Sequence, residues 1–202
     1  ALPIWGNQDI NLQRKALRIQ GSDPEDPAVV EATVIDCGGI AADPHRGFYV
    51  SEFAGEIAGL TITNGLASAG GAIYCRASTL AVKQCHIINN ATLDGTDSDG
   101  GAGGGIYCEA SALEIVGCLI SGNTTGAGAE ARSGLADQGG DGGGVYSTGS
   151  VLYVSDSIVS ENTTGDGGDS EGIAGQGGNG AGIHGDSLVV SNSRVINNRC
   201  GQ

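Results

Sequence analysis

Basic residues, prolines and long apolar runs are scarce in this chain of 202 residues. Its 9 Lys and Arg residues face 23 Asp and Glu residues, and the net charge of −14 makes nucleic acids and anionic membranes poor partners. Only 4 residues are proline, and apolar residues recur in regular short runs, which argues against disorder. No apolar run approaches the roughly 20 residues that a helix needs to span a bilayer. The sequence therefore predicts a folded chain that does not insert into membranes.

Several common motifs are missing as well. The 6 cysteines include no C-x-x-C pair, which argues against a zinc site or a thioredoxin-type motif. Glycine is the commonest residue at 38, but it lacks the every-third-residue period of collagen. No helical period extends beyond about one turn, so we expect an all-β fold.

What the chain does contain is a repeat. GGAIYCRASTLAVKQCHIINN (70–90) and GGGIYCEASALEIVGCLISGN (103–123) are nearly alike, further copies lie at 142–162 and, shortened by two residues, at 180–198, and a weaker copy lies at 46–64. Within each copy, apolar residues alternate with polar or small ones over short stretches, which indicates strands with one buried face. Such repeats predict a right-handed parallel β-helix of about five to six coils. We expect one continuous domain, with a lead-in and first coil in 1–46 and repeated coils in 47–202.

Equivalent residues of neighbouring coils should lie about 4.8 Å apart, so that like residues stack on like. An inner aliphatic ladder is predicted from Ile73, Ile106, Val145 and Ile183. An asparagine ladder, whose amides can bond along the stack, is predicted from Asn90, Asn123, Asn162 and Asn198. A small inward stack at a bend is predicted from Cys85, Cys118, Ser157 and Ser193.

Tyrosines occupy one outward position in four successive coils, and His184 takes that position in the fifth. They are Tyr49, Tyr74, Tyr107 and Tyr146. A solvent-facing aromatic stack could bind a sugar chain or another protein. The alternative is that the stacked rings only stabilise the strands.

The segments between each asparagine and the next glycines vary in length, at 91–102, 124–141 and 163–180. Insertions of this kind map to one face of a solenoid. Hard cations need six to eight oxygen ligands, which makes the loop acids candidate calcium ligands. The candidates are Asp97, Asp99, Asp141, Asp166 and Asp169. The alternative is that these acids only solvate exposed loops.

Four cysteines recur at identical spacing in two successive coils, and serine takes both positions in the next coil. They are Cys75 and Cys85, then Cys108 and Cys118. The pattern fits disulfides within each coil or two stacks between coils, and the connectivity stays open. Cys37 and Cys200 lie near opposite ends, so they could bond only across a junction between molecules.

With these ladders, the chain resembles the secreted bacterial right-handed parallel β-helix repeat proteins, and GGAI at 70–73 is similar to the motif of polymorphic outer-membrane-protein repeats. The similarity runs from about Asp9 to Asn198 and includes the lead-in at 16–39, which looks like a first coil. The resemblance implies a location outside the cell or at its surface. It implies no single function, because this architecture serves adhesins, passenger domains, lyases and stalks.

Catalytic motifs of β-helix enzymes are missing from the sequence. A polygalacturonase-like site would have an N-T-D strand, a D-D pair and an R-I-K, and none is present. His184-Gly185 resembles an H-G motif but occupies the Tyr-Cys position of the repeat. A pectate-lyase-like site needs a base beside calcium-binding carboxylates. The basic residues lie at non-equivalent repeat positions: Arg76, Lys83, Arg132, Arg194 and Arg199. We therefore predict no enzyme, and a polysaccharide lyase or hydrolase is the third hypothesis.

The ends of the solenoid carry the functional hypothesis, because open strand edges are normally capped. No amphipathic helix follows the last coil at 195–198, whereas Ile4 and Trp5 could fold over the first coil. Either the chain is a piece of a longer β-helix, or its ends pair with other copies. The second explanation predicts an extracellular structural subunit that stacks head to tail into a filament. The alternative is a surface adhesin or carbohydrate-binding stalk that uses the tyrosines or the acidic loops.

Overall fold

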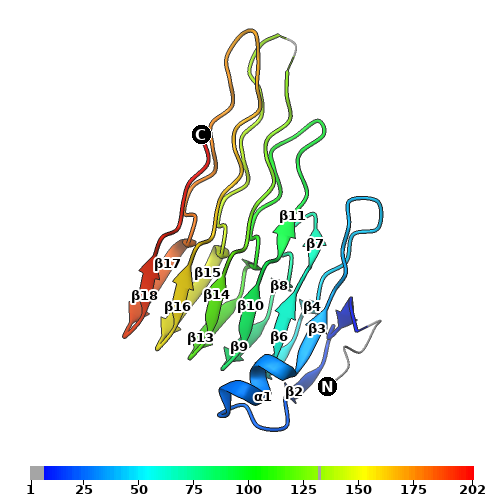
Figure 1. Ribbon diagram of the computed structural model, residues 1–202, viewed down its shortest axis with the longest axis vertical. Coiled ribbons are helices and arrows are strands. Elements are labelled where there is room, and N and C mark those ends of the chain that lie inside the picture. The colour runs from blue at the N-terminus through cyan, green and yellow to red at the C-terminus, as the bar shows by residue number, and fades with distance from the viewer. Residues whose placement is uncertain (1–6, 132) are drawn as a thin grey trace.

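The computed structural model describes residues 7–131 and 133–202, and Ile4 and Trp5 lie outside this part. Parallel strands stack as a β-solenoid of about five turns (Figure 1). The predicted all-β parallel solenoid is therefore confirmed. No helix within the described residues is long and apolar enough to cross a membrane.

Each coil contributes strands to three faces. The first face holds β1 (Ile10–Asn11), β4 (Phe48–Ser51), β8 (Ile73–Arg76) and β12 (Ile106–Glu109). The second holds β2 (Ala16–Gln20), β5 (Ala54–Ala58), β9 (Thr79–Lys83) and β13 (Ala112–Val116). The long strands β15 (Val145–Ser155) and β17 (Ile183–Ser191) cross both faces and join them into one 10-stranded sheet.

The third face is a 6-stranded sheet. It contains β3 (Val34–Asp36), β6 (Thr61–Thr63), β10 (His86–Ile88), β14 (Leu119–Ser121), β16 (Ile158–Ser160) and β18 (Arg194–Ile196). Two short strands, β7 (Leu66–Ala67) and β11 (Ala91–Thr92), pair beside it. Strand pairs such as β1–β4 and β2–β5 link the lead-in to the repeats, so the solenoid is continuous across residues 46 and 47.

Sharp corners between the faces use a backbone conformation that most residues avoid. Ala77, Gln84 and Asn89 in one coil have φ of 47°, 48° and 56°. The left-handed region costs a non-glycine residue roughly 1 kcal/mol. Ser78, Cys85 and Asn90 directly follow these three residues. The Ser78 hydroxyl accepts a hydrogen bond from a backbone N–H of the preceding coil. The backbone N–H groups of Cys85 and Asn90 donate to side chains of the next coil. The strained corners are thus held by bonds between coils.

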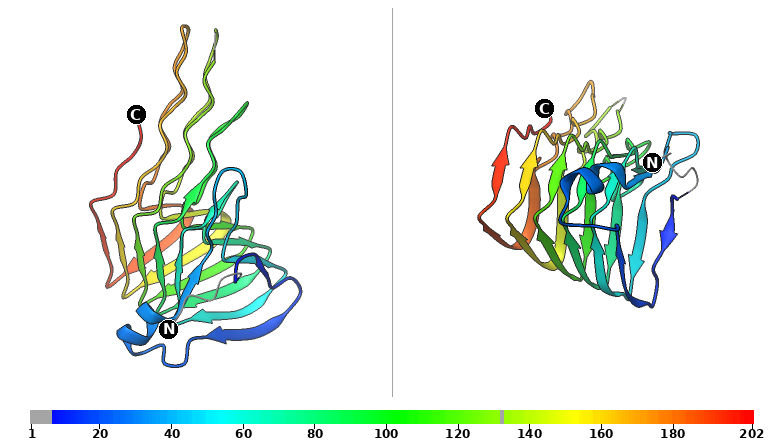
Figure 2. Two further views of the ribbon diagram at one scale, coloured as in Figure 1. Left: turned by 45° about the vertical axis from the view of Figure 1, so that its right-hand side comes forward. Right: turned by 60° about the horizontal axis from the view of Figure 1, so that its bottom comes forward.

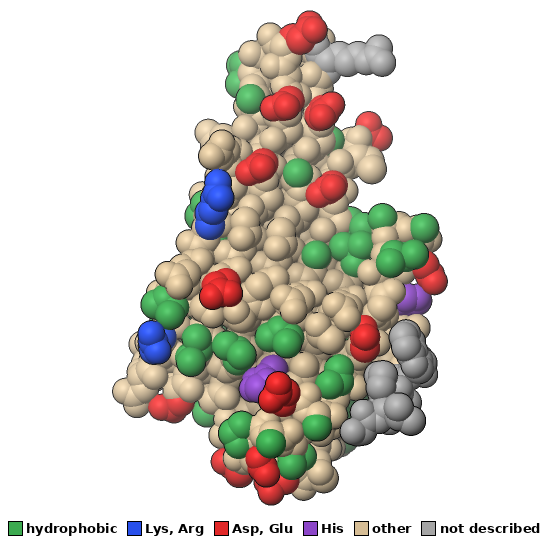
Figure 3. Space-filling model, in the orientation of Figure 1, with side chains coloured by type: hydrophobic (Ala, Val, Ile, Leu, Met, Phe, Trp, Pro, Cys, Tyr) green, Lys and Arg blue, Asp and Glu red, His purple; other side chains and the backbone are tan. Residues whose placement is uncertain are grey.

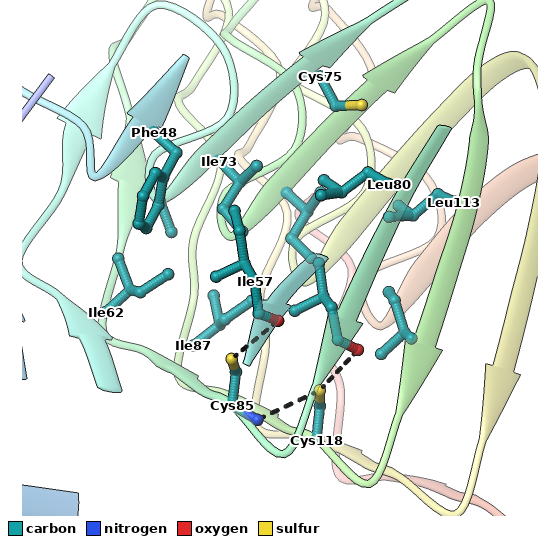
Figure 4. Close-up of a cluster of buried hydrophobic side chains, with 14 of the residues drawn as sticks. Phe48, Ile57, Ile62, Ile73, Cys75, Leu80, Cys85, Ile87, Leu113 and Cys118 are labelled. Carbon is teal, nitrogen blue, oxygen red and sulfur yellow. Dashed lines mark hydrogen bonds between the residues drawn. The ribbon is translucent and has the colours of Figure 1, made fainter. Parts of the chain in front are cut away.

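The core fills the inside of the coils with aliphatic side chains. Phe48, Ile73, Leu80 and Ile87 are at most 1% exposed, and Figure 4 shows them pointing into the space between the faces. In-register pairing places Ile73, Ile106, Val145 and Ile183 in one inner ladder, as the alternation predicted. Because each strand buries alternate residues, the pattern in the sequence dictates which side chains meet.

Helix α1 (Pro27–Ala32) interrupts the β structure, and the sequence periodicity did not indicate it. Asp26 caps it by accepting a hydrogen bond from the Ala28 N–H, and Pro27 follows the cap, where its missing N–H costs nothing. Val30 is buried, and its carbonyl accepts a bond from the Thr61 hydroxyl. In Figure 1, α1 lies beside the foot of β6, so it covers the side of the solenoid.

Long loops project from one edge of the coils as extended arms (Figure 2). We name them the first arm (91–102), second arm (124–141) and third arm (163–180). The two legs of an arm bond to each other, as between the Gly140 N–H and the Gly126 carbonyl at 2.9 Å. Neighbouring arms also bond to each other, as between the Gly128 N–H and the Asp166 carbonyl at 2.9 Å. The arms therefore extend the stacking beyond the strands.

Candidate functional site

The four asparagines lie in one continuous hydrogen-bonded column. The Asn123 side-chain oxygen accepts from the backbone N–H and the side-chain amide of Asn90, both at 3.0 Å. Asn162 accepts from Asn123 in the same way, and Asn198 accepts from Asn162. Asn90, Asn123 and Asn162 are at most 1% exposed. Each buried amide thus supplies a hydrogen-bond acceptor for a backbone N–H at a corner of the preceding coil, which gives the column a structural role.

Two cysteine stacks run between coils. Cys75 pairs in register with Cys108 across β8 and β12. Cys118 accepts a hydrogen bond from the Cys85 backbone N–H at 3.5 Å (Figure 4). All four side chains are buried thiols. The structure therefore brings cysteines together between coils and does not bring together the two cysteines of one coil.

Burial raises the pKa of most of these thiols, whereas the hydrogen bond with Cys75 lowers the pKa of Cys108. The hydrogen bond from Cys75 to Cys108 and burial together raise the pKa of the Cys75 thiol. Burial raises the pKa of Cys85 to about 11 and that of Cys37 to about 12. Because the thiolate is the nucleophile and the metal ligand, Cys37, Cys75 and Cys85 stay protonated and inert at neutral pH. Cys200 is exposed, and its bond to Cys37 of another molecule stays a prediction.

A serine column at another corner escaped the sequence reasoning. The Ser78 hydroxyl accepts from the Phe53 N–H, the Ser111 hydroxyl from the Ser78 N–H, and the Ser150 hydroxyl from the Ser111 N–H, at 2.9–3.0 Å. Its sequence signal was available, since each of these serines follows the Tyr-Cys or Tyr-Ser pair at the same spacing. Such corner acceptors carry no hydrophobic pattern, which is why the alternation did not reveal them.

The outward tyrosines form a stack of nearly parallel rings. Successive ring centroids from Tyr49 to Tyr146 lie 5.1–5.3 Å apart, and His184 continues the stack 5.1 Å beyond Tyr146. The guanidinium of Arg46 lies 5.2 Å from the Tyr74 ring centre. All four rings are half-buried, and burial raises the pKa of Tyr107 to about 12. The ring faces are occupied by neighbouring rings, so mainly ring edges and hydroxyls are left for a ligand.

Three of the five predicted calcium ligands accept hydrogen bonds from backbone N–H groups of a neighbouring arm or of the C-terminal segment. Asp99 accepts from the Gln138 N–H, Asp141 from the Asn179 N–H and Asp166 from the Gln202 N–H, at 2.6–2.8 Å. Asp97 is exposed, and Asp169 lines an open hollow with Glu130 and Glu171. Figure 3 shows acidic side chains distributed along the arms.

The five carboxylates are not brought together. Within residues 7–131 and 133–202, no three His, Cys, Asp or Glu side chains converge in a way that could hold a metal ion. Calcium binding in the arms therefore stays a prediction, and no cluster of ligands supports it.

Within residues 7–131 and 133–202, no strand covers the C-terminal edge of the solenoid. Strands β17 and β18 each pair on one side only, with β15 and β16. The inward residues Leu188, Val190 and Val195 are 40%, 42% and 48% exposed. Their counterparts one coil earlier, on β15 and β16, are at most 1% exposed. We call this surface the open edge; it combines unpaired backbone with the cut end of the hydrophobic core.

The last coil also lacks one corner. Ser147 and Val151 of β15 pair with Gly185 and Ser187 of β17. Asp186 alone lies between these two partners, whereas β15 has residues 148–150 at the same place, so the register shifts there. The Asp186 carboxylate accepts from the Gly149 N–H at 2.8 Å and from the Thr148 hydroxyl at 3.3 Å. A charged side chain thus replaces the missing corner at the open edge.

Comparison with known proteins gives no relative: no family model matches the chain, and neither the curated proteins nor the solved structures include a match.

Proposed function

We propose that this chain is an extracellular structural β-solenoid subunit that associates end to end with other copies of itself through the open edge. The observation that carries the proposal is the exposure of Leu188, Val190 and Val195, which continue the inner ladders of the core but are covered by no coil within the described residues. Unpaired strands with exposed apolar side chains bind further strands readily. Non-closing contacts of this kind generate filaments.

The N-terminal edge of a second copy fits the open edge in register. If the pairing of the existing coils continues, Ile183 meets Ile10, and Leu188 and Val190 meet Leu17 and Ile19. Val195 meets Ile35 on the third face. Each of these four ladders therefore continues with an aliphatic residue. Leu17, which points inward at the N-terminal edge, is itself 37% exposed.

Charges at the junction also match. Asp186 lies at the corner where the first coil has Lys15 and Arg14, which pairs with Glu52 at 3.1 Å; both basic side chains are exposed. Stacking in register brings this carboxylate towards the basic pair of the next copy. Exposed ion pairs of this kind contribute roughly 0–1 kcal/mol to the free energy of association, and they act mainly on the register of stacking and on the association rate.

The test is the oligomeric state of the purified chain. We expect its mass by sedimentation to rise with concentration, and negative-stain microscopy to show rods many coils long. Val190→Lys places a charge in the inner ladder at the open edge and should give monomers. Ser191→Lys, next along the strand and outward, is the matched control and should still associate. Circular dichroism of both variants checks that the solenoid is intact.

Asp186→Asn keeps the oxygen that accepts from Gly149 and removes only the charge. We expect it to weaken association modestly and to reduce its dependence on salt. Monomers of the unmodified chain at millimolar concentration would contradict self-association. Closed dimers in place of rods would contradict the head-to-tail arrangement.

Glycan binding by the tyrosine stack, the basis of the adhesin hypothesis, has weaker support. Sugars bind aromatic rings through the ring face, where the negative charge of the quadrupole lies. In this stack the faces of Tyr74 and Tyr107 contact neighbouring rings on both sides. We therefore assign the stack to stabilising the first face.

A further inference from the structure

One tyrosine stands apart from the aromatic stack. Tyr153 lies on the second face, on the outward side of β15, and is 51% exposed. In the part of the chain that the structure describes, its ring stacks on no other aromatic ring, although four other tyrosines do so. A large aromatic side chain is therefore displayed on a strand face with its ring accessible.

A shallow hollow of about 320 Å³ lies beside Tyr153. Its lining includes the small residues Gly55, Ala81 and Ala112, on three successive coils, together with Thr79, Leu80 and Leu113. Ala112 is exposed, so the sheet surface is open there next to the ring. The hollow has the size of one or two sugar rings and is lined mainly by apolar surface, as ligand sites usually are.

Polar groups stand at the side of this hollow. Glu114 pairs in register with Tyr153 across β13 and β15, and its side chain is 53% exposed. The Lys83 ammonium lies 3.7 Å from Glu114 and 3.2 Å from Glu56. The carboxylate can accept hydrogen bonds from hydroxyls, and the ammonium can donate to them.

We propose that this hollow binds one or two rings of an uncharged oligosaccharide, with one ring stacked on Tyr153 and its hydroxyls bonded to Glu114 and Lys83. The C–H groups of a pyranose face carry slight positive charge and complement the negative face of an aromatic ring. The Glu114 carboxylate at the hollow and the net charge of −14 disfavour a polyuronate. The site is on the side of the solenoid, so it does not depend on end-to-end association.

Titration calorimetry with hexamers of β-1,4-linked glucose, N-acetylglucosamine and galacturonic acid tests the proposal. We expect saturable binding of at least one uncharged hexamer and none of the galacturonate. Tyr153→Ala should weaken that binding by roughly tenfold, whereas Tyr153→Phe keeps the ring and should change it little. Val151→Ala, an exposed neighbour on the same strand, is the matched control.

Failure of both uncharged hexamers to bind would overturn the proposal. So would equal affinity of Tyr153→Ala and the unmodified chain, or preference for the galacturonate hexamer. Competition by an aromatic-rich peptide but not by sugars would assign the hollow to a protein partner and would also overturn it. Thermal melts show whether a variant that loses sugar binding has also lost its fold. Sedimentation shows whether sugar binding depends on association between copies.

Discussion

At the scale of single residues, the buried polar side chains decide how well one coil fits the next. Asn123 uses both its amide oxygen and its amide nitrogen, which bonds to the carbonyl of Ile87 at 2.9 Å and to Asn162. A buried amide costs several kcal/mol when it lacks partners and little when it has them. The column therefore tolerates burial because every coil supplies the same residue.

Ser147 breaks this rule, and its replacement should stabilise the protein. It is 0% exposed, it follows Cys75 and Cys108 in their ladder, and its hydroxyl has no hydrogen-bond partner among the described residues. An unsatisfied buried hydroxyl costs about 1–3 kcal/mol. Ser147→Cys, which continues the ladder, should raise the free energy of unfolding in urea by roughly 1 kcal/mol.

Ser157 provides the opposite case in the same coil. It accepts from the Cys118 N–H and donates to the Ser155 carbonyl. Ser157→Ala leaves that N–H without an acceptor and should lower the free energy of unfolding by about 1–2 kcal/mol. Replacing Ser147 should thus raise the free energy of unfolding, and replacing Ser157 in the same coil should lower it. Equal responses would show that burial alone governs both sites.

At the scale of elements, the turn before β4 contains a pH-sensitive contact. The His45 Nδ1 atom lies 2.6 Å from Asp9, and Nε2 lies 3.2 Å from Asp43. The hydrogen bond to Asp9 raises the pKa of His45, and the bond and charge of Asp43 raise it further. The raised pKa means that the folded chain binds the proton more tightly than the unfolded chain does.

This contribution to stability is complete below the ordinary histidine pKa of about 6.5 and is lost as the pH rises through the higher pKa of the folded state. We predict that His45→Gln removes this pH dependence from the free energy of unfolding measured between about pH 5.5 and 9. His86→Gln, on the outer side of β10, is the control and should leave the dependence in place. A stability difference between His45→Gln and the unmodified chain that grows with pH would contradict the assignment.

The arms depend on glycine for close approach. A Cβ atom on Gly139 would lie 2.0 Å from the Gly165 carbonyl oxygen on the third arm. Gly139→Ala should therefore separate the second and third arms, lower stability by about 1–3 kcal/mol, and expose the arms to limited proteolysis. Gly185→Ala is the control, because its Cβ would lie 3.6 Å from the nearest atom, on Ser147. Equal protease resistance of both variants would contradict close packing of the arms.

The sequence predicts some elements well and others poorly, for physical reasons. Strands and the inner ladder follow from alternation, since Ile73 and Cys75 point inward and Tyr74 outward. The asparagine column follows because Asn90 recurs at one repeat position. The arms do not follow, because glycine carries no hydrophobic pattern and their shape comes from backbone bonds. The hollow beside Tyr153 does not follow either, since it depends on small residues from coils far apart in sequence.

At the scale of the whole molecule, stability should vary along the solenoid axis. Each coil contacts only its neighbours, so end coils have half the support of middle ones. We predict that amides of β18 exchange faster than those of β10 in monomeric protein, and that association protects β18. Uniform exchange rates along the axis in monomers would show that the solenoid opens as one unit.

The corner bonds also have a direction, which matters when the chain is being made. Asn90 N–H donates to Asn123, 33 residues later, and Asn123 N–H donates to Asn162, 39 residues later. At roughly 5–20 residues per second, a ribosome needs a few seconds to supply each missing acceptor. A nascent chain therefore always ends in one unfinished coil, and it is completed from its first turn to its last in the order of synthesis.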